Sequence, residues 1–167
     1  QPNPHGLSLR MEWIEGVSYA NEMEPCMYMG AEKEADGTFK GFMDFTPEEI
    51  MTRSIFSVKQ DITLLSDNIV PLGGKKIKEI FEKKGLTVND IDHFLPHISS
   101  NFFRSKIYDM IEEYGGGIPY EKWFINLYTV GNVGAASIYL MIIEMFHSGK
   151  LKKGEKLLLL VPESARF

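Results

Sequence analysis

The second half of the chain alternates short apolar runs with longer stretches in which apolar residues recur at helical spacing. The apolar runs predict strands at residues 54–59, 91–96, 123–128 and 156–161. The stretches between them predict helices at residues 61–85, 100–114 and 134–146. Strands that alternate with helices of this length form largely parallel sheets that helices cover on both faces. The pattern therefore predicts an α/β fold with the order βαβαβαβ after residue 54.

Shorter local signals dominate the amino-terminal part of the chain. Residues 7–14 alternate apolar and polar side chains, which predicts a half-buried strand. The pair Asp36-Gly37 follows another apolar run and predicts a hairpin turn. Thr46, Pro47 and Glu49 together predict a helix start, with Thr46 as the cap, Pro47 in the first position and Glu49 closing a capping box.

Residues 126–149 contain the most informative turn of the sequence. An apolar run leads into Gly131-Asn132, and a helix that opens with small residues follows. Asn132 is therefore expected at the carboxyl end of a strand, where open α/β sheets build their sites. Its amide can bind a developing negative oxygen without changing charge, or it can cap the helix. The local sequence leaves both interpretations open.

His97 follows the predicted strand 91–96 in the same way that Asn132 follows strand 123–128. Neighbouring strands lie about 4.8 Å apart, so side chains at their ends can reach one ligand atom. A neutral His N–H and an Asn amide N–H aimed at one oxygen form an oxyanion hole. Taken singly, a structural histidine and a helix-capping asparagine are the simpler interpretations, and the two residues together favour a site.

Length, composition and charge set limits on the class of protein. The chain has 167 residues, of which 44% are hydrophobic and 25% charged, as in an ordinary soluble domain. It has no apolar run of the roughly 18 residues that a membrane-spanning helix needs. The net charge of −5 speaks against binding nucleic acid. We therefore expect a soluble protein with neither a membrane nor a nucleic-acid partner.

Cysteine and histidine content argue against a metal site. Cys26 is the single cysteine, which excludes an internal disulfide and fits a cytoplasmic location. Its apolar neighbours predict a small buried side chain. The spacing His93-x-x-x-His97 matches a zinc pair on a helix, but the surrounding sequence predicts a strand and supplies no evident third ligand. We expect no bound metal and no cofactor.

The two ends of the sequence indicate a piece of a longer protein. Gln1 is not an initiator methionine, and the residues after it do not form a signal peptide. The last residues after Val161 form a turn that leads toward a further strand. We expect that this last strand is truncated.

These motifs carry a resemblance to a known family. A Leu-Pro-His motif that ends at His97, the turn Gly131-Asn132-Val-Gly-Ala-Ala-Ser137, and Gly154-Glu-Lys before an apolar strand resemble the carboxyl half of β-ketoacyl-acyl-carrier-protein synthase III enzymes. Residues 9–28 resemble the segment that joins the two halves of those enzymes. The resemblance therefore covers nearly the whole chain.

The resemblance implies a thiolase-like half with a mixed, largely parallel sheet of the five-stranded type. It implies a segment at residues 1–45 that joins the two halves and a carboxyl-terminal domain at residues 46–167. The family condenses an acyl group on a Cys nucleophile with a malonyl thioester, and His97 and Asn132 match the His and Asn that stabilise the enolate. The nucleophile belongs to the amino half, so this chain alone should be inactive.

The same resemblance implies the partners. It implies acyl-CoA or acyl-carrier protein as the acyl donor, malonyl-acyl-carrier protein as the acceptor, the amino half of the same protein as a partner, and a homodimer. The sequence departs from the family where Ile98-Ser99-Ser100 follows His97 and where Val133-Gly134 follows Asn132. Two alternatives therefore stay open, a non-catalytic thiolase-fold partner subunit and an acyltransferase that forms esters or amides.

Overall fold

The computed structural model describes Asn3 and residues 6–164, which form two units. The larger unit comprises the described residues of Gln1–Gly16 together with Val70–Pro162, and the smaller one those of Val17–Ile69 and Glu163–Phe167. The division lies inside one helix, α2 (Ile62–Lys84). The boundary between residues 45 and 46 that the family resemblance implies stays a prediction.

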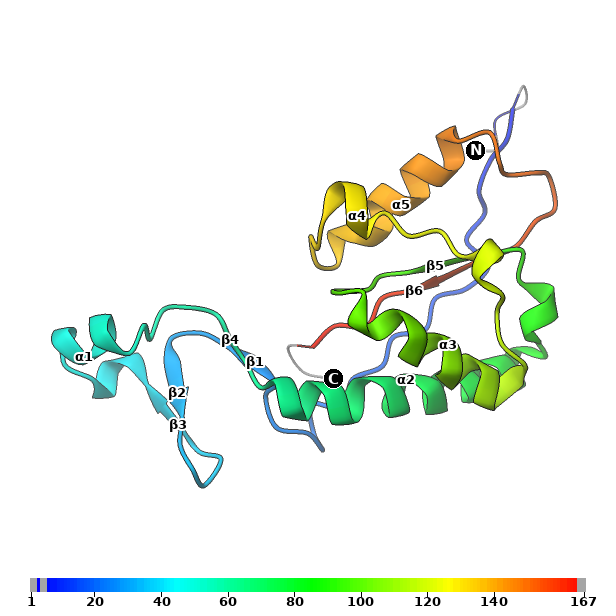
Figure 1. Cartoon of the computed structure of the whole chain (residues 1–167). Helices are drawn as coiled ribbons and strands as arrows, with labels where there is room; N and C mark the ends of the chain where they lie inside the picture. The colour runs from blue at the N-terminus through cyan, green and yellow to red at the C-terminus, as the bar shows by residue number, and fades with distance from the viewer. Residues whose placement is uncertain (1–2, 4–5, 165–167) are drawn as a thin grey trace. The chain divides into compact units, whose positions relative to one another are not determined.

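A parallel pair of strands lies at the centre of the larger unit (Figure 1). Strand β5 (His93–Pro96) pairs with β6 (Leu157–Leu160), in a register that places Phe94 beside Leu158 and Leu95 beside Leu159. On the other side of β5, Trp123 forms a single parallel bridge to Phe94. Both strands were predicted from the sequence, and both are confirmed.

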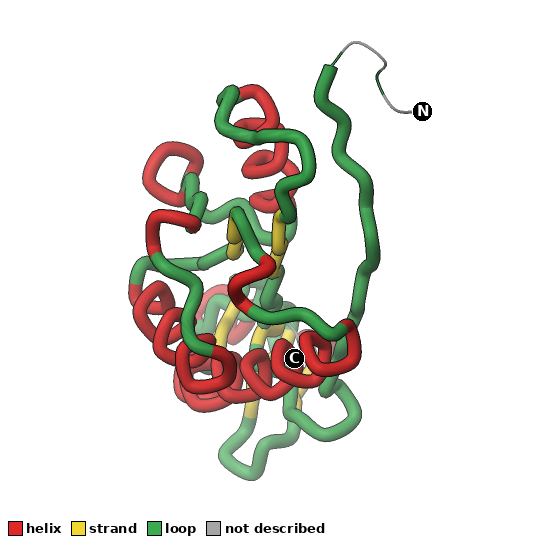
Figure 2. The backbone as a smooth tube through the Cα atoms, turned by 90° about the vertical axis from the view of Figure 1, so that its right-hand side faces the viewer, coloured by secondary structure: helices red, strands yellow, loops and turns green. Residues whose placement is uncertain are grey.

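Helices cover both faces of this sheet, as Figures 1 and 2 show. The carboxyl-terminal part of α2 and helix α3 (Phe102–Gly115) pack on the face that carries Phe94 and Leu158. Helix α5 (Ala136–His147) packs on Leu95 at the other face, and the short helix α4 (Leu127–Val130) precedes it, with Leu127 packed against the core that contains Phe94. Side chains alternate between the faces of a strand, so each strand contributes to both cores. Two 3-10 turns, η2 (Val88–Asp90) and η3 (Tyr120–Lys122), connect these elements.

The smaller unit is built from short local elements. Strand β1 (Met27–Tyr28) pairs antiparallel with β4 (Lys59–Gln60), and β2 (Ala31–Lys33) forms a hairpin with β3 (Phe39–Gly41). A 3-10 turn, η1 (Phe42–Asp44), leads to helix α1 (Pro47–Thr52). The pairing of β2 with β3 confirms the predicted hairpin. The predicted helix start is confirmed as well, because Thr46 and Glu49 form the reciprocal bonds of a capping box.

Three predicted strands are wrong in whole or in part. Residues 7–14 pair with no strand among the described residues, and of their side chains Trp13 packs on the core while Met11 and Ile14 stay exposed. Residues 54–57 form a turn closed by a hydrogen bond from Ser57 N–H to the Ser54 carbonyl, which leaves β4 only at 59–60.

The predicted strand at residues 123–128 is reduced to the Trp123 bridge, since the Asn126 carbonyl accepts from the backbone N–H groups of Thr129 and Val130 and starts α4. The sheet of the five-stranded type expected from the sequence is therefore represented, in the part of the chain that the structure describes, by β5, β6 and this bridge. The α/β class with helices on both faces is confirmed. The expected truncated strand falls beyond the described residues.

Candidate active site

His97 lies directly after β5 and is almost completely buried, with 4% of its surface exposed. Its backbone N–H donates to the Leu160 carbonyl at 2.8 Å, so the parallel ladder continues to this residue and fixes where its side chain begins. The predicted position at the carboxyl end of a strand is confirmed. The role of His97 in chemistry stays a prediction.

The predicted position of Asn132 at the carboxyl end of a strand is wrong, because helix α4 precedes it; Asn132 lies in the turn between α4 and α5 and is exposed. Gly131 ends α4 with a φ of 84°, a backbone conformation that favours glycine, and donates its N–H to the Leu127 carbonyl. The Asn132 Oδ1 atom accepts from the Gly134 N–H at 3.0 Å. This bond stabilises the turn before α5, whose cap residue is Ala135. Asn132 therefore uses its side-chain oxygen locally, and its Nδ2 group is the atom suited to a ligand.

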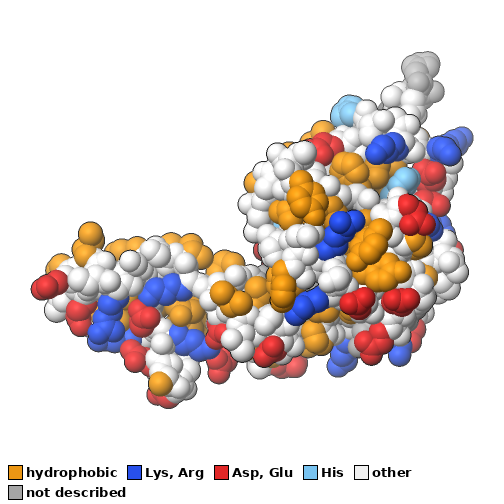
Figure 3. Space-filling view, viewed as in Figure 1, with side chains coloured by type: hydrophobic (Ala, Val, Ile, Leu, Met, Phe, Trp, Pro, Cys, Tyr) orange, Lys and Arg blue, Asp and Glu red, His pale blue; other side chains and the backbone are white. Residues whose placement is uncertain are grey.

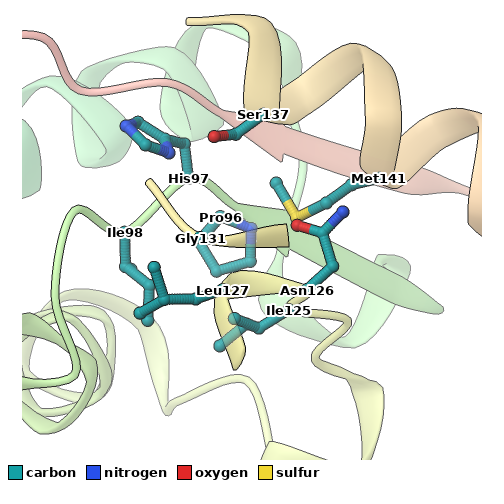
Figure 4. A pocket seen from close by; sticks show the side chains of 9 residues that line it. All are labelled: Pro96, His97, Ile98, Ile125, Asn126, Leu127, Gly131, Ser137 and Met141. Carbon is teal, nitrogen blue, oxygen red and sulfur yellow. The ribbon is translucent and has the colours of Figure 1, made fainter. Parts of the chain in front are cut away.

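A small pocket opens at the carboxyl end of β5, and Figure 4 shows the side chains around it. Its lining comes from the end of β5, the segment that enters α4, the glycine after α4, and the first turns of α5. The lining residues are Pro96, His97, Ile98, Ile125, Asn126, Leu127, Gly131, Ser137 and Met141. The structure therefore brings His97 together with Asn126 and Ser137, and Asn132 lies one residue beyond the lining.

Asn126 and Ser137 are polar residues of this pocket that the sequence analysis did not identify. They are 6% and 4% exposed, and the Asn126 Nδ2 and Ser137 Oγ atoms make no hydrogen bond with the described residues. In Figure 4 the Ser137 hydroxyl group is turned toward the His97 ring. A polar residue inside the apolar run 123–128 is the sequence signal that could have identified Asn126.

The pocket is lined without any Lys, Arg, Asp or Glu side chain among the described residues. Apolar side chains dominate the lining, which strengthens any hydrogen bond that forms inside. The arrangement suits a neutral acceptor oxygen, or an oxygen that becomes negative only during a reaction.

The other sequence candidates lie in different surroundings. His93 starts β5, and its Nε2 atom lies 3.0 Å from Glu155 Oε2, so the residue forms part of a polar pair at the other end of the strand. The backbone N–H of Lys152, together with His93, holds the pKa of Glu155 below its ordinary value. Within the residues that the structure describes, no three His, Cys, Asp or Glu side chains are grouped to hold a metal ion.

Cys26 is fully buried in the smaller unit, as the sequence predicts. Its Sγ atom donates to the Asp61 carbonyl at 3.3 Å. Burial raises the pKa of the thiol, which keeps it protonated near neutral pH. A protonated, inaccessible thiol is a poor nucleophile.

The fold and the pocket together define an α/β protein with a largely apolar pocket at the carboxyl end of a parallel strand, in which a histidine, an asparagine and a serine are the polar residues. Residues 81–161 match the family model described as "3-Oxoacyl-[acyl-carrier-protein (ACP)] synthase III C terminal". The match contains His97, Asn126, Asn132 and Ser137. This match confirms the recognition made from the sequence: the region that contains the pocket is similar to the carboxyl-terminal part of ketosynthase III proteins, and the fold is thiolase-like.

Curated relatives give the same result. The chain is 31% identical over 107 residues to a beta-ketoacyl-[acyl-carrier-protein] synthase III of Clostridium perfringens, which covers 57% of this chain and 32% of the relative. It is 30% identical over 112 residues to the beta-ketoacyl-[acyl-carrier-protein] synthase III 2 of Halalkalibacterium halodurans, which covers 67% of this chain and 31% of the relative. The chain thus matches about a third of the length of these relatives.

Solved structures confirm the fold. The 3-oxoacyl-(acyl carrier protein) synthase III of Pseudomonas aeruginosa PAO1 superimposes with a TM-score of 0.61 at 18% identity, over 90% of this chain and 41% of that chain. The beta-ketoacyl-[acyl-carrier-protein] synthase III of Thermus thermophilus gives 0.55 at 23% identity, over 85% and 43% of the two chains. At these identities the likeness concerns the fold alone.

No helix within the described ranges is long and apolar enough to cross a bilayer.

Proposed function

We propose that this chain is the carboxyl-terminal half of an acyl-thioester condensing enzyme of the ketosynthase III type. The observation that carries the proposal is the buried His97 at the carboxyl end of β5, in an uncharged pocket inside the region that matches the family model. The reaction is a decarboxylative Claisen condensation of an acyl thioester with a malonyl thioester, as in fatty-acid or polyketide-like biosynthesis.

His97 and Asn132 supply neutral hydrogen-bond donors for this reaction. Loss of carbon dioxide from the malonyl group leaves its electron pair on the α-carbon, and the charge is shared with the thioester oxygen as an enolate. Neutral donors stabilise that oxygen by about 3–4 kcal/mol each in a site that excludes water. The bond between Asn132 Oδ1 and Gly134 N–H supports this role, because it fixes the amide and leaves Nδ2 to donate.

The nucleophile is expected outside this chain. The acyl group is carried by a cysteine thiolate, whose sulfur leaves when the enolate carbon attacks the acyl carbonyl. Cys26 does not suit this step, since its thiol is buried and its pKa is raised. We expect the cysteine in an amino-terminal half, and we expect this chain alone to be inactive in condensation.

The substrates and assembly follow from the same proposal. The acyl donor is acyl-CoA or acyl-carrier protein, the acceptor is malonyl-acyl-carrier protein, and the complete enzyme is a cytoplasmic homodimer. The reaction needs no metal or cofactor, since the electron pair comes from the malonyl carboxylate and the acyl group from a thioester.

The test uses a longer protein that contains this chain together with an amino-terminal half. We expect His97→Ala and Asn132→Ala each to lower the rates of malonyl decarboxylation and condensation by about 10²–10³-fold. His147→Ala is the matched control, because His147 is exposed at the end of α5, and it should keep the original rates. If both site variants kept near-normal rates, the roles assigned to His97 and Asn132 would be wrong.

The same protein separates the alternatives. A longer sequence without a cysteine at the nucleophile position would identify a non-catalytic partner subunit. Mass spectrometry of the products would identify an ester or amide in place of a β-ketoacyl product. The departure from the family pattern at Ile98-Ser99-Ser100, directly after His97, supports this alternative.

A further inference from the structure

Two polar atoms in the His97 pocket have no partner in the fold. Among the described residues, three buried side-chain nitrogen or oxygen atoms make no hydrogen bond, and two of them, Asn126 Nδ2 and Ser137 Oγ, line this pocket. The third, Arg104 Nε, belongs to a guanidinium group stacked over the Tyr120 ring. Buried polar atoms in folded proteins are nearly always satisfied, so two unsatisfied atoms at one pocket indicate that a bound group supplies their partner.

Local structure does not account for either side chain. Asn126 is the cap residue of α4, yet its side chain makes no capping bond, and the first bonds of α4 go to its backbone carbonyl. Ser137 lies in the first turn of α5, where a serine hydroxyl often bonds to a preceding carbonyl, but its Oγ makes no such bond. The Asn126 Nδ2 and Ser137 Oγ atoms therefore keep their hydrogen-bonding capacity, and both residues line the pocket together with His97.

The lining indicates the chemical class of the bound group. None of the described lining residues is a Lys or Arg, so a phosphate or carboxylate would be buried there without a fixed cation. Burial of an unpaired anion is strongly unfavourable. An uncharged carbonyl oxygen accepts hydrogen bonds from an amide N–H and a hydroxyl group at no such cost.

We propose that Asn126 and Ser137 form a further substrate-binding subsite beside His97. This subsite binds the uncharged carbonyl oxygen of the thioester substrate. The identity of the ligand rests on the proposed function. The Asn126 Nδ2–H group and the Ser137 hydroxyl donate to the ligand and position it, whereas Asn132 approaches from the adjacent turn. These two residues are distinct from the His97 and Asn132 pair.

The experiment titrates the complete 167-residue chain with the acetyl thioester of N-acetylcysteamine. Side-chain amide signals are followed by NMR, with the Asn126 signal assigned from its loss in Asn126→Leu. We expect a saturable shift of the Asn126 amide, and a dissociation constant raised up to about tenfold in Asn126→Leu and in Ser137→Ala, the effect of one lost hydrogen bond. The exposed residues Asn89 and Ser105 give the controls Asn89→Ala and Ser105→Ala, which should bind as the unchanged chain does.

The outcomes separate this subsite from the proposed function. If the Asn126 amide signal does not shift at any probe concentration, the subsite is overturned; a pocket that holds only water gives this result. Equal dissociation constants for all four variants would overturn the subsite as well. If Asn126→Leu does not fold, the amide shift in the unchanged chain and the Ser137→Ala titration still decide. Saturable contact at Asn126 without condensation by the longer protein would overturn the proposed function and leave the subsite standing.

Discussion

Ser137 and Ser148 lie near opposite ends of α5, and their hydroxyl groups have opposite relations to the fold. Ser137 Oγ is buried and makes no hydrogen bond among the described residues. Ser148 Oγ donates to the Met145 carbonyl at 2.6 Å and accepts from the Lys150 N–H at 3.1 Å. At the scale of single residues, the Ser137 hydroxyl group therefore makes no hydrogen bond that would stabilise the fold, whereas the Ser148 hydroxyl group helps to end the helix.

This contrast predicts opposite effects on stability. Ser137→Ala removes an unpaired buried hydroxyl, so the free energy of unfolding should stay unchanged or increase. Ser148→Ala removes two bonds and should lower it by about 1 kcal/mol. Urea unfolding followed by circular dichroism measures both values under the same conditions. A loss above about 1 kcal/mol in Ser137→Ala would show that its hydroxyl is bonded within the fold.

Single residues also show where sequence reasoning reaches its limit. The position of His97 is predictable, because a short apolar run that ends in a polar residue marks the carboxyl end of a strand. The role of Ser137 is not predictable, since the sequence Ala135-Ala136-Ser137 is explained equally well by close packing of α5 on the sheet. Whether a buried hydroxyl has a partner depends on segments distant in sequence, and one chain read alone does not contain that information.

The element with the clearest local cause is the start of α2. Asp61 precedes the helix, and its Oδ1 accepts from the Leu64 N–H at 2.9 Å while its Oδ2 lies 3.0 Å from Lys33 Nζ. The carboxylate also lies near the positive end of the helix dipole. Asp61 therefore acts as a helix cap and links α2 to β2 within the smaller unit.

Substitutions at Asp61 should separate the cap from the charge. Asp61→Ala removes both and should lower the free energy of unfolding by about 1–2 kcal/mol. Asp61→Asn keeps a good capping side chain and loses only the ion pair with Lys33, so it should cost less. Asp67→Ala, on the exposed side of the same helix, is the control and should change stability by less than about 0.5 kcal/mol. Equal losses in the Ala and Asn variants would show that the charge, and not the cap, carries the effect.

The same carboxylate makes stability depend on pH. The backbone N–H of Leu64 and then Lys33 hold the pKa of Asp61 below its ordinary value in the folded chain. The unfolded chain therefore binds the proton more tightly, and the stabilisation is present above about pH 4 and is lost as pH falls through the lower, folded value. Unfolding free energies measured from pH 6 down to pH 2 should fall less steeply in Asp61→Asn than in the unchanged chain. Parallel curves would contradict the assignment.

Elements with local causes are the ones that the sequence predicts well. The Asp36-Gly37 hairpin, the Thr46 cap and the stop of α2 before Gly85, where φ is 62°, depend on residues a few positions apart. Residues 123–128 are mispredicted because an apolar run fits a strand or a buried helix start equally well. There the hydrogen bonds from Thr129 and Val130 to Asn126 decide the outcome.

At the scale of the whole molecule, the surface retains many apolar side chains. Figure 3 shows hydrophobic side chains on the visible face of both units. Large apolar residues of the smaller unit are among the most exposed, and these are Met29, Met43, Met51, Phe56, Val58 and Ile62. Exposed apolar surface of this kind marks sites that bind other protein surfaces. Under the proposed function, an amino-terminal half or a second subunit covers part of it.

This surface predicts self-association of the chain when it is purified alone. Light scattering coupled to size exclusion should give a mass above 19.0 kDa that rises with concentration. Because apolar contacts drive the association, added sulfate should strengthen it. An association driven by contacts between charges would instead weaken as the salt concentration rises. Met43→Lys combined with Met51→Lys should shift the chain toward monomer without lowering its unfolding midpoint, since both side chains are largely exposed. A single species of 19.0 kDa at every concentration and salt would refute the prediction and would mean that these side chains do not form an interface.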